Sequence, residues 1–491
     1  MSTKYKMVMM GLAVVFVYFA AVVNAAVDIG NKRQIFVDDY IVGSLNGTSY
    51  KMHEPVNEGM AIKLHDKPWE DRYCGYITVL KDGDVYRMYY RSIYNADHQG
   101  QGAYCYATSA DGINWTKPNL GLHEYDGSRE NNIMLLGPDG THSFSPFIDT
   151  NPLSKPQERY KAIGLRRTAD EKAWVLLAFV SPDGINWQLL QQEPVFTDGA
   201  FDSQNVPFWS ESEHKYVVYY RTKSNGQTGI RRISRTTSDD FINWSTGVQM
   251  EYVCRGQDAP IEELYTNQTF PYFRAPDVYI ATAARFMHGK RAVTDEQAAS
   301  LEALSLGKPV FRDCSDAVLL SSRGGNIYQR TFMEGWIRPG MGLENWVTRT
   351  NYPALNIVQT GPNEMSTYLI EGYGLQTLRV QRYSLRLDGF VSINAPYAGG
   401  EFITKPLRFT GNKLEINYST SAAGSVQVEI QDAAGNPIDG FSLKDCSMII
   451  GDEISRKAAW GDKTLEPLQN TDVRLRFVMK DADIYSFKFE N

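Results

Sequence analysis

One short sequence pattern occurs several times in this chain and constrains its fold more than any other feature. Residues 181–187 read Ser-Pro-Asp-Gly-Ile-Asn-Trp, and residues 109–115 are a near-identical copy. Residues 238–244 form a looser copy and residues 322–328 a degenerate one. Each copy offers Asp or Gly residues that tolerate a positive φ, followed by an aromatic residue that can cover the edge of a sheet. The pattern predicts a tight turn between β-strands at each copy.

The spacing of the copies indicates a repeating sheet. They lie roughly 60 to 85 residues apart, which is long enough for one four-stranded sheet per repeat. Five pairs of candidate strands follow in order, and each opens with an apolar strand, a turn and an aromatic-rich second strand. The opening strands are expected at 76–80, 145–149, 205–209, 269–273 and 354–358. The predicted fold class is all-β, with a five-bladed β-propeller.

A propeller needs a strand from the other end of the chain to complete its last blade, because ring closure removes the exposed sheet edge. The apolar stretch at 34–42 precedes the first blade and is expected to supply that strand. Residues 294–306 form the one convincing helical stretch, an insertion within the fourth blade. Short alternating strands at 414–418, 426–430 and 473–477 predict a C-terminal β-sandwich over 397–491, which leaves 27–396 for the propeller.

The first 26 residues have the composition of a secretory signal peptide. Lys4 and Lys6 precede an apolar run from residue 7 to residue 23, and small residues follow up to Ala25 and Ala26. Cleavage after one of these two alanines would place the mature protein outside the cell or in a periplasm. An uncleaved anchor helix is the alternative.

Charge and cysteine usage exclude several classes of function. The 491-residue chain has a formal net charge of −7, which argues against general affinity for nucleic acid or for anionic membranes. Its five cysteines include no Cys-x-x-Cys pair, so the sequence implies neither a zinc site nor a disulfide scaffold. One or two disulfides remain possible in an exported protein.

The loops that lead into the innermost strands of a propeller lie on one face, so their side chains converge on an axial mouth. Two facing carboxylates in such a mouth are what hydrolysis of a glycosidic bond requires. The carboxylates expected there as catalytic candidates are Glu70, Asp71, Asp202, Glu263 and Glu334. The alternative is that they cap turns through backbone N–H groups.

Polar and aromatic residues that could bind a sugar accompany these carboxylates. Those in the same loops are Trp69, His142, Gln204, Asn205, Asn267, Arg338 and Arg349. The second strand of four blades also runs into an arginine, and these are Arg91, Arg166, Arg221 and Arg285. Several guanidinium groups at one mouth would favour an anionic sugar that carries a carboxylate or a sulfate. Salt bridges at the surface or between blades are the alternative.

With its repeated turns, its five blade openings and its trailing sandwich, the chain resembles the secreted five-bladed propeller glycoside hydrolases of families 32, 43 and 68. That resemblance implies a nucleophile or base on the first blade, a supporting Asp on the second and an acid Glu on the third. The chain departs from this pattern. It offers Glu70 and Asp71 on the first blade, Asp149 as the nearest carboxylate on the second, and Asp202 on the third. Fructan cleavage is therefore not supported, and sialidases are a weaker resemblance.

These observations lead to three hypotheses. The first is a secreted glycoside hydrolase that cleaves a polysaccharide or oligosaccharide, including an anionic one, with two carboxylates and without metal or cofactor. Asp202 and one of Glu70 or Asp71 are the expected working pair, with Glu263 and Glu334 in reserve. The second is a non-catalytic carbohydrate-binding propeller. The third is phosphorolysis, which requires several cationic groups beside the acid to hold phosphate.

Overall fold

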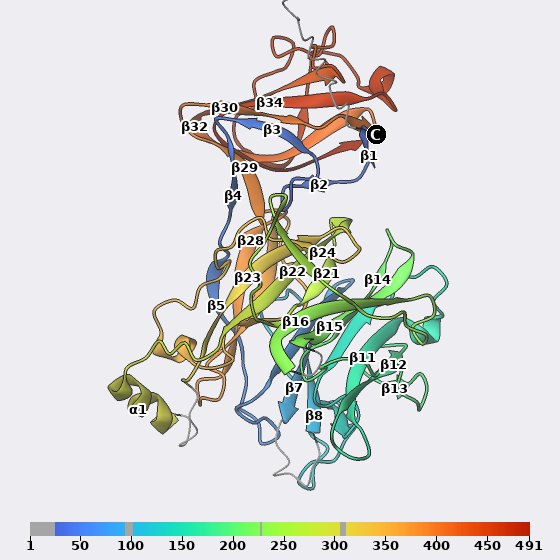
Figure 1. Ribbon diagram of the computed structural model, residues 1–491, viewed down its shortest axis with the longest axis vertical. Helices are drawn as coiled ribbons and strands as arrows, with labels where there is room; N and C mark the ends of the chain where they lie inside the picture. Colours follow the sequence, from blue (N-terminus) through green and yellow to red (C-terminus); the bar gives the residue numbers. More distant parts are fainter. Residues whose placement is uncertain (1–24, 94–101, 226–227, 305–310) are drawn as a thin grey trace, which may run out of the picture.

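The computed structural model describes residues 25–93, 102–225, 228–304 and 311–491 (Figure 1). These residues form mainly β-structure, with a propeller-like ring of sheets below a curled sheet in the view of Figure 1. The predicted signal segment lies almost entirely outside the described residues. No helix in the described ranges is long and apolar enough to cross a membrane.

Five sheets follow one another along the chain and build the ring, and all their pairings are antiparallel except that of β18 (Glu251–Cys254) with β24 (Ile327–Gln329) in the fourth. The first contains β6 (Gly75–Asp82), β7 (Val85–Ile93), β8 (Gly102–Ser109) and β9 (Ile133–Gly137). The second contains β10 (Phe144–Ile148), β11 (Tyr160–Arg167), β12 (Trp174–Ser181) and β13 (Gln188–Leu189). The third contains β14 (Val206–Ser210), β15 (Lys215–Asn225), β16 (Thr228–Ser238) and β17 (Val248–Gln249).

The last two sheets of the ring are larger. The fourth contains β18 (Glu251–Cys254), β19 (Gln257–Asp258), β20 (Leu264–Thr266), β21 (Thr269–Tyr272), β22 (Ala275–Met287), β23 (Cys314–Ser322) and β24 (Ile327–Gln329). The fifth contains β25 (Tyr352–Pro353), β26 (Val358–Gln359), β27 (Glu364–Glu371), β28 (Arg379–Arg386) and β5 (Val56–Lys63). The predicted order of opening strands is confirmed. The fifth opening strand is broken into β25 and β26, which are separated by residues 354–357.

The ring closes between its first and fifth sheets. Contacts run in order from β6 to β10, β14 and β21, and β26 returns to β6. The backbones of Thr78 and Leu355 form a parallel bridge at this closure. Strand β5 completes the fifth sheet by pairing antiparallel with β28. Closure by an N-terminal strand is thus confirmed, but the predicted segment, 34–42, is wrong, because it lies in the curled sheet instead.

The curled sheet has ten strands and takes them from both ends of the chain. Its N-terminal strands are β1 (Val27–Gly30), β2 (Gln34–Ile35), β3 (Val42–Asn46) and β4 (Ser49–Met52). Its C-terminal strands are β29 (Val391–Ala395), β30 (Gly400–Thr404), β31 (Leu407–Phe409), β32 (Lys413–Asp432), β33 (Asp452–Ala458) and β34 (Val473–Glu490).

Strands β32 and β34 are long, and their pairing shifts register between Thr420 and Ser425. A shift of this kind bends a sheet, so one continuous sheet curls around its own aromatic core. The predicted separate β-sandwich of residues 397–491 is corrected in two respects. The pairing is that of a single sheet, and residues 27–52, predicted to lie in the propeller, belong to it.

The repeated heptapeptides form closely similar turns. In the second copy, Asp183 accepts hydrogen bonds from the backbone N–H groups of Ile185 and Asn186, while Trp187 donates to the carbonyl of Gly184. The first copy repeats these contacts, and the third repeats those of its Asp. The turn needs a positive φ at its fourth residue, where the third copy places Phe241 at 66°. The turns also join sheets, since Tyr368 of the fifth sheet donates its hydroxyl to the carbonyl of Gly112.

The predicted helix is confirmed as α1 (Asp295–Leu304), an insertion between β22 and β23. Its apolar residues Ala298 and Leu301 pack in one cluster with Val347 and Leu375, and Trp346 packs against that cluster. The helix therefore supports the segment that carries Trp346 and Val347. All five cysteines are free thiols.

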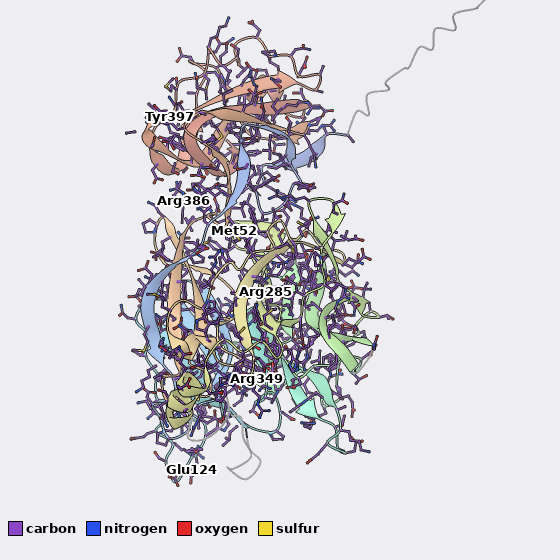
Figure 2. All side chains as sticks on the ribbon, turned by 60° about the vertical axis from the view of Figure 1, so that its left-hand side comes forward. Met52, Glu124, Arg285, Arg349, Arg386 and Tyr397 are labelled. Atoms are coloured by element: carbon purple, nitrogen blue, oxygen red, sulfur yellow. The ribbon has the colours of Figure 1, made fainter. Side chains whose placement is uncertain are left out.

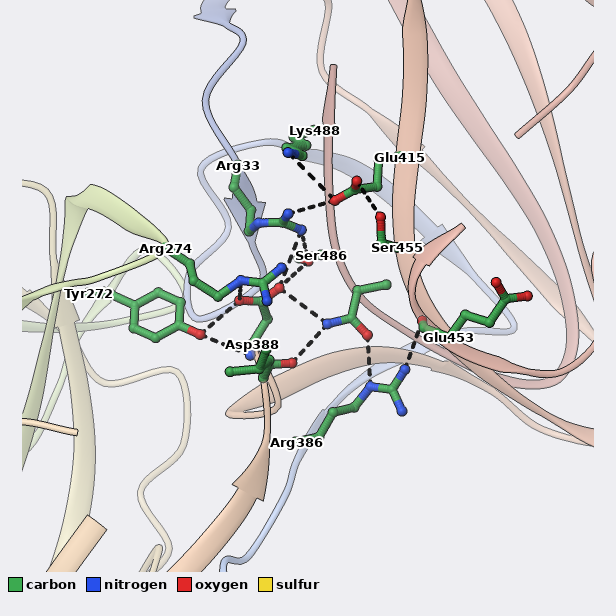
Figure 3. A network of polar contacts seen from close by, with 12 residues as sticks. Arg33, Tyr272, Arg274, Arg386, Asp388, Glu415, Glu453, Ser455, Ser486 and Lys488 are labelled. Carbon is green, nitrogen blue, oxygen red and sulfur yellow. Dashed lines mark hydrogen bonds and ion pairs between the residues drawn. The ribbon is translucent and has the colours of Figure 1, made fainter. Parts of the chain in front are cut away.

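A buried carboxylate joins the ring to the curled sheet. Asp388 is fully buried and receives hydrogen bonds from Tyr272 of the ring and from Asn417 and Ser486 of the curled sheet (Figure 3). Arg33 and Arg274 lie 3.4 and 3.0 Å from its oxygens. A buried charge is stable only when it is paired and hydrogen-bonded, so this network fixes the two parts against each other.

Candidate functional site

A polar pocket lies at the axial mouth where the innermost strands begin, as the loop pattern predicts. Gly75 and Tyr76 come from the start of β6, and Tyr352 comes from the start of β25. The other residues that line the pocket are Arg91, Asp202, Tyr265, Arg349, Ile370 and Tyr373. Figure 2 shows Arg349 in the ring, well away from Tyr397 of the curled sheet.

The loop that carries Asp202 is fixed by hydrogen bonds on both sides. Asn205 donates through Nδ2 to the carbonyls of Phe201 and Ser203, which flank Asp202. The Ser203 hydroxyl donates to the carbonyl of Tyr265 at 2.9 Å. Arg221 donates through Nε to the carbonyl of Ala200. The carboxylate thus projects from a loop whose backbone is held in one position.

Asp202 is an ionised carboxylate that solvent can reach. Its side chain is 49% exposed, and its Oδ1 lies 2.8 Å from His142 Nε2, while Arg221 Nη2 lies 3.5 Å from Oδ2. Burial would raise the pKa of the Asp202 carboxyl, but the hydrogen bond from His142 and the charge of Arg221 together bring it well below its usual range. Burial lowers the pKa of His142 more than its bond to Asp202 raises it. His142 is therefore neutral at pH 7 and donates its Nε2–H.

Two guanidinium groups, those of Arg91 and Arg349, line the pocket itself. Arg91 donates to the carbonyls of Tyr73 and His142 at 3.0 and 3.3 Å and lies over the Tyr76 ring at 4.5 Å. Arg349 lies 5.7 Å from the centre of the Tyr265 ring. Among the described residues, no carboxylate lies within ion-pair distance of Arg349. With Arg221 beside Asp202, three arginines thus surround one carboxylate.

Backbone conformations of high energy occur in this pocket. Arg349 has a φ of 61° and Tyr76 a φ of 49°, a region that side chains with a Cβ rarely adopt. Such conformations persist where the surrounding structure enforces them, and they are frequent at binding and catalytic sites. The conformation of Arg349 places its guanidinium in the pocket at a cost to stability.

Some buried polar atoms at the mouth have no hydrogen-bond partner among the described residues. They include Arg221 Nη1 and the Tyr352 hydroxyl. A buried donor without a partner costs free energy, typically about 1–3 kcal/mol. An anionic ligand at this position would provide acceptors for both groups.

The floor of the pocket is closed by amides that reach across the axis. Gln204 donates through Nε2 to Thr78 Oγ1 at 3.0 Å, and its Oε1 accepts from Gln268 Nε2 at 2.7 Å. Gln268 also donates to the carbonyl of Pro353. Four sheets of the ring are joined in this way. Gln204 is therefore a structural residue below the pocket, rather than a contact to substrate as predicted.

The free space in the pocket is small. It measures about 20 Å³, which accommodates one water-sized group such as an oxygen of a carboxylate or sulfate. A wider pocket of about 530 Å³ opens at the other end of the axis, but its lining is mainly aromatic and aliphatic, as at Phe147, Phe208 and Leu355. Because converging polar groups characterise catalytic sites, the mouth with Asp202 is the candidate site.

The structure does not bring the predicted first-blade carboxylates into the pocket. Glu70 is buried, lies 2.7 Å from Lys117 and accepts a hydrogen bond from Tyr90 at 2.7 Å, so it is part of a buried ion pair. Asp71 accepts the backbone N–H of Tyr73 at 2.7 Å, which is the turn-capping alternative. Trp69 donates to Asn132 Oδ1 at 2.7 Å and packs into the core of the first sheet. Asp202 is thus the one predicted catalytic residue that lines the pocket.

Three further candidates are engaged elsewhere. Arg166 is bound to Asp139 at 2.6 Å on the second sheet. Asn267 is buried and accepts from the backbone N–H and the hydroxyl of Thr269. Glu263 forms an ion pair with Arg231. For Arg166 the predicted approach to the mouth is wrong, because a local carboxylate neutralises the guanidinium.

Three other candidates gather in a second pocket. Arg285, Glu334 and Arg338 line a cavity of about 680 Å³ beside the fourth sheet, together with Glu262, Asp316 and Trp346. Arg285 is bound to Glu262 and Asp316, so it is not free to hold an anion. Arg338 is 67% exposed.

The tyrosines are the part of the site that the sequence-based candidates lack. Tyr76, Tyr265, Tyr352 and Tyr373 line the pocket, and burial raises the pKa of Tyr76, Tyr352 and Tyr373, so those phenols are protonated donors at pH 7. Their place in the strands is the sequence signal by which two of these tyrosines could have been found. Tyr76 and Tyr352 stand at the first or second position of a first strand, where a side chain faces the mouth.

Comparisons with known proteins find structural likeness at low identity. No protein-family model matches the sequence, and no curated protein matches it. Among solved structures, one named as a glycoside hydrolase has a TM-score of 0.45 and 12% identity over 68% of this chain and 92% of its own.

Two others were solved with carbohydrate. An N-acetylgalactosamine deacetylase from F. plautii, in complex with blood group B trisaccharide, has a TM-score of 0.43 and 12% identity over 71% of this chain and 97% of its own. A fructofuranosidase from Schwanniomyces occidentalis, complexed with fructosylnystose, has a TM-score of 0.37 and 10% identity over 88% and 97%. Likeness of this size does not identify a family or an activity.

Proposed function

We propose that this protein is a carbohydrate-active enzyme that cleaves a glycosidic bond next to an anionic sugar, with the anionic group bound at the axial mouth. The observation that carries the proposal is Arg349, a half-buried guanidinium without a carboxylate partner among the described residues, held at a φ of 61° beside Asp202. A cation that contacts aromatic side chains and has no carboxylate partner, kept at a cost in backbone energy, favours a negatively charged ligand.

The chemistry of the pocket suits a uronic acid carboxylate or a sulfate ester. Planar guanidinium groups bind both through two parallel hydrogen bonds. Arg349 supplies such donors from the lining of the pocket, and the Tyr352 hydroxyl supplies another. Arg221 lies behind the lining, beside Asp202. The narrow base admits one anionic oxygen, while the sugar ring lies against the tyrosines above it.

Asp202 is the proposed catalytic carboxylate. Because its pKa is low, it is ionised in the free enzyme and is suited to act as a base toward water or as a nucleophile toward the anomeric carbon. His142 and Arg221 are positioning residues that orient its two oxygens. A hydrolase with two carboxylates would need an acid as its second group. In the described part of the mouth, Asp202 is the single carboxylate that lines the pocket.

That single carboxylate favours one second candidate, phosphorolysis. Inorganic phosphate would lie among the arginines and attack the anomeric carbon. The glycosidic C–O bond would break, and the leaving oxygen would take its proton from Asp202, whose pKa a bound phosphate dianion would raise. A reaction of this kind needs one carboxylate and a cluster of cations.

We also propose that the five sheets are the blades of one propeller, and that the chain is exported. The first proposal rests on the order of sheets around the axis. The second rests on the basic and apolar pattern of residues 1–26 alone.

The test is a screen of the full mature chain on neutral, uronic and sulfated oligosaccharides, each with and without inorganic phosphate. Release of free sugar from the anionic members alone is the expected result. Formation of a sugar 1-phosphate, detected by 31P NMR and dependent on phosphate, would replace hydrolysis by phosphorolysis. Binding of anionic sugars with no turnover in either condition would show a binding protein. Equal activity on neutral and anionic sugars would refute the proposed role of Arg349.

A further inference from the structure

We infer that the second pocket, of about 680 Å³, binds a neutral sugar unit adjoining the anionic unit at the axial mouth. This inference rests on the proposed function and extends it from one sugar unit to at least two. Its basis is the proximity of the two pockets, a half-buried tryptophan, and an even balance of charge.

The same chain segments line both pockets. Trp346 lines the second pocket and Arg349 the axial one, three residues further along the chain. The same holds for the segment that runs into β20, where Glu262 lines the second pocket and Tyr265 the axial one. Three residues span at most about 11 Å, so the pockets are neighbours on one face of the ring. A chain of sugar units could therefore extend from one to the other.

Trp346 has the features of a platform for a sugar ring. It is half-buried, and its indole N–H donates to the carbonyl of Gly340 at 2.8 Å, which fixes the plane of the ring. Helix α1 packs against it through Leu301 and its cluster. A rigid aromatic surface in a pocket binds the apolar face of a sugar at low entropic cost.

The charges around the second pocket balance one another. Asp316 is neutralised by Arg285, and Glu262 lies between Arg285 and Arg330. The lining as a whole carries three carboxylates and three cations, which are Glu262, Asp316 and Glu334 against Arg285, Lys290 and Arg338. Carboxylates that are already paired keep lone pairs for hydroxyl donors, but they attract no net charge. The occupant is therefore a neutral sugar that is rich in hydroxyl groups.

The chain-length dependence of binding tests this inference. The probes are methyl glucuronide and galactose 6-sulfate, and disaccharides in which each is joined to a neutral hexose on either side. Isothermal titration calorimetry on the intact protein should show that one disaccharide binds more tightly than its monosaccharide. In the Trp346→Ala variant the affinity for that disaccharide should fall by about tenfold, while the affinity for the monosaccharide is unchanged.

Trp346→Phe is the matched control, since it keeps an aromatic plate and loses the hydrogen bond to Gly340. It should retain most of the gain, and both variants should unfold at temperatures close to the wild type. Equal loss of monosaccharide and disaccharide binding, or no loss of either, would overturn the second pocket as a sugar site. If the wild type binds the monosaccharides but gains nothing from a second sugar, the inference fails while the proposed function stands. If it binds none of the probes, the proposed function itself is wrong.

Discussion

The hydroxyl of Tyr272 makes two hydrogen bonds to Asp388 across the junction between the ring and the curled sheet. It donates to the carboxylate Oδ1 at 2.8 Å and accepts the backbone N–H of the same residue at 2.9 Å. Asp388 has a φ of 62° and no exposed surface, so both the side chain and the backbone of this residue are fixed from the ring side. One phenol thus specifies how the two parts of the molecule meet (Figure 3).

Removing the Asp388 carboxylate should destabilise the protein strongly. Asp388→Ala leaves Arg33 and Arg274 at the junction without this partner, and loss of one member of a buried ionic group costs about 3–5 kcal/mol. Tyr272→Phe removes the two hydrogen bonds alone and should cost about 1–3 kcal/mol. Both values are measured as free energies of unfolding in urea. The control is Asp452→Ala, which removes the 63% exposed partner of Arg386 and should change stability by less than about 1 kcal/mol. A smaller loss in Asp388→Ala than in the control would contradict this account.

Arg349 should be a position where glycine is more stable than alanine. At a φ of 61° alanine keeps the strain that a Cβ imposes, whereas glycine does not, so Arg349→Gly should exceed Arg349→Ala in stability by about 1 kcal/mol. Both variants should lose affinity for an anionic monosaccharide by about 1.5–3 kcal/mol, because a charged hydrogen bond is lost. Thermal unfolding and calorimetric titration give the two quantities. Arg166→Ala removes a guanidinium outside the mouth and should leave binding unchanged.

Asp202→Asn should abolish most turnover while the fold stays intact. The substitution keeps the shape of the side chain and removes its charge, and a catalytic base or nucleophile treated in this way loses about 10² to 10⁴ in kcat. Asp239→Asn is the matched control, since Asp239 is an exposed partner of Lys215 on the third sheet. Steady-state kinetics on the best substrate from the screen provide the measurement. Near-normal turnover in Asp202→Asn would remove this residue from the proposed mechanism.

Acid should destabilise the repeated turns through their aspartates. Burial raises the pKa of Asp183, but the hydrogen bonds from Asn186, Ile185 and Ser181 lower it by more. The resulting pKa is about 2, against about 3.9 in an unfolded chain. A pKa that is lower in the folded state means stability that is present above pH about 4 and is lost as the pH falls toward 2. For this partly exposed turn the contribution is at most about 1 kcal/mol.

The variant Asp183→Asn should therefore be slightly less stable than the wild type at pH 7 and should lose less stability on acidification. Urea unfolding at pH 7, 4 and 3 measures both effects. Identical pH profiles for the two proteins would show that the low pKa of Asp183 does not contribute to folding.

The order of strands in the ring could be predicted because it depends on local chemistry. Each heptapeptide specifies its own turn through an Asp and a residue at positive φ, and aromatic-rich strands precede it. The closing strand could not be assigned in the same way. Residues 34–42 and the strand β5 are both apolar enough to complete a blade, and the choice between them is made by pairing with β28 more than 300 residues away.

The candidate site was predictable to the extent that loop position decides it. Asp202 and Arg349 lie at the mouth because their loops lead into inner strands. Glu70 occupies the equivalent loop of the first sheet, but Lys117 and Tyr90 bind it, and both lie well further along the chain. Whether a loop carboxylate faces solvent or pairs with a buried cation is a tertiary property.

The ten-stranded sheet combines the first strands of the chain with the last, and this has a consequence for how the protein is made. Lys51 of β4 pairs with Ser392, and Val27 pairs with Leu407, so strands that are made early have partners that are made more than 300 residues later. Contacts of such long range form slowly. A nascent chain would therefore hold residues 27–52 unpaired and prone to aggregation until residues 391–409 have been made, and a chain that stops before residue 391 would leave that segment without a sheet to join.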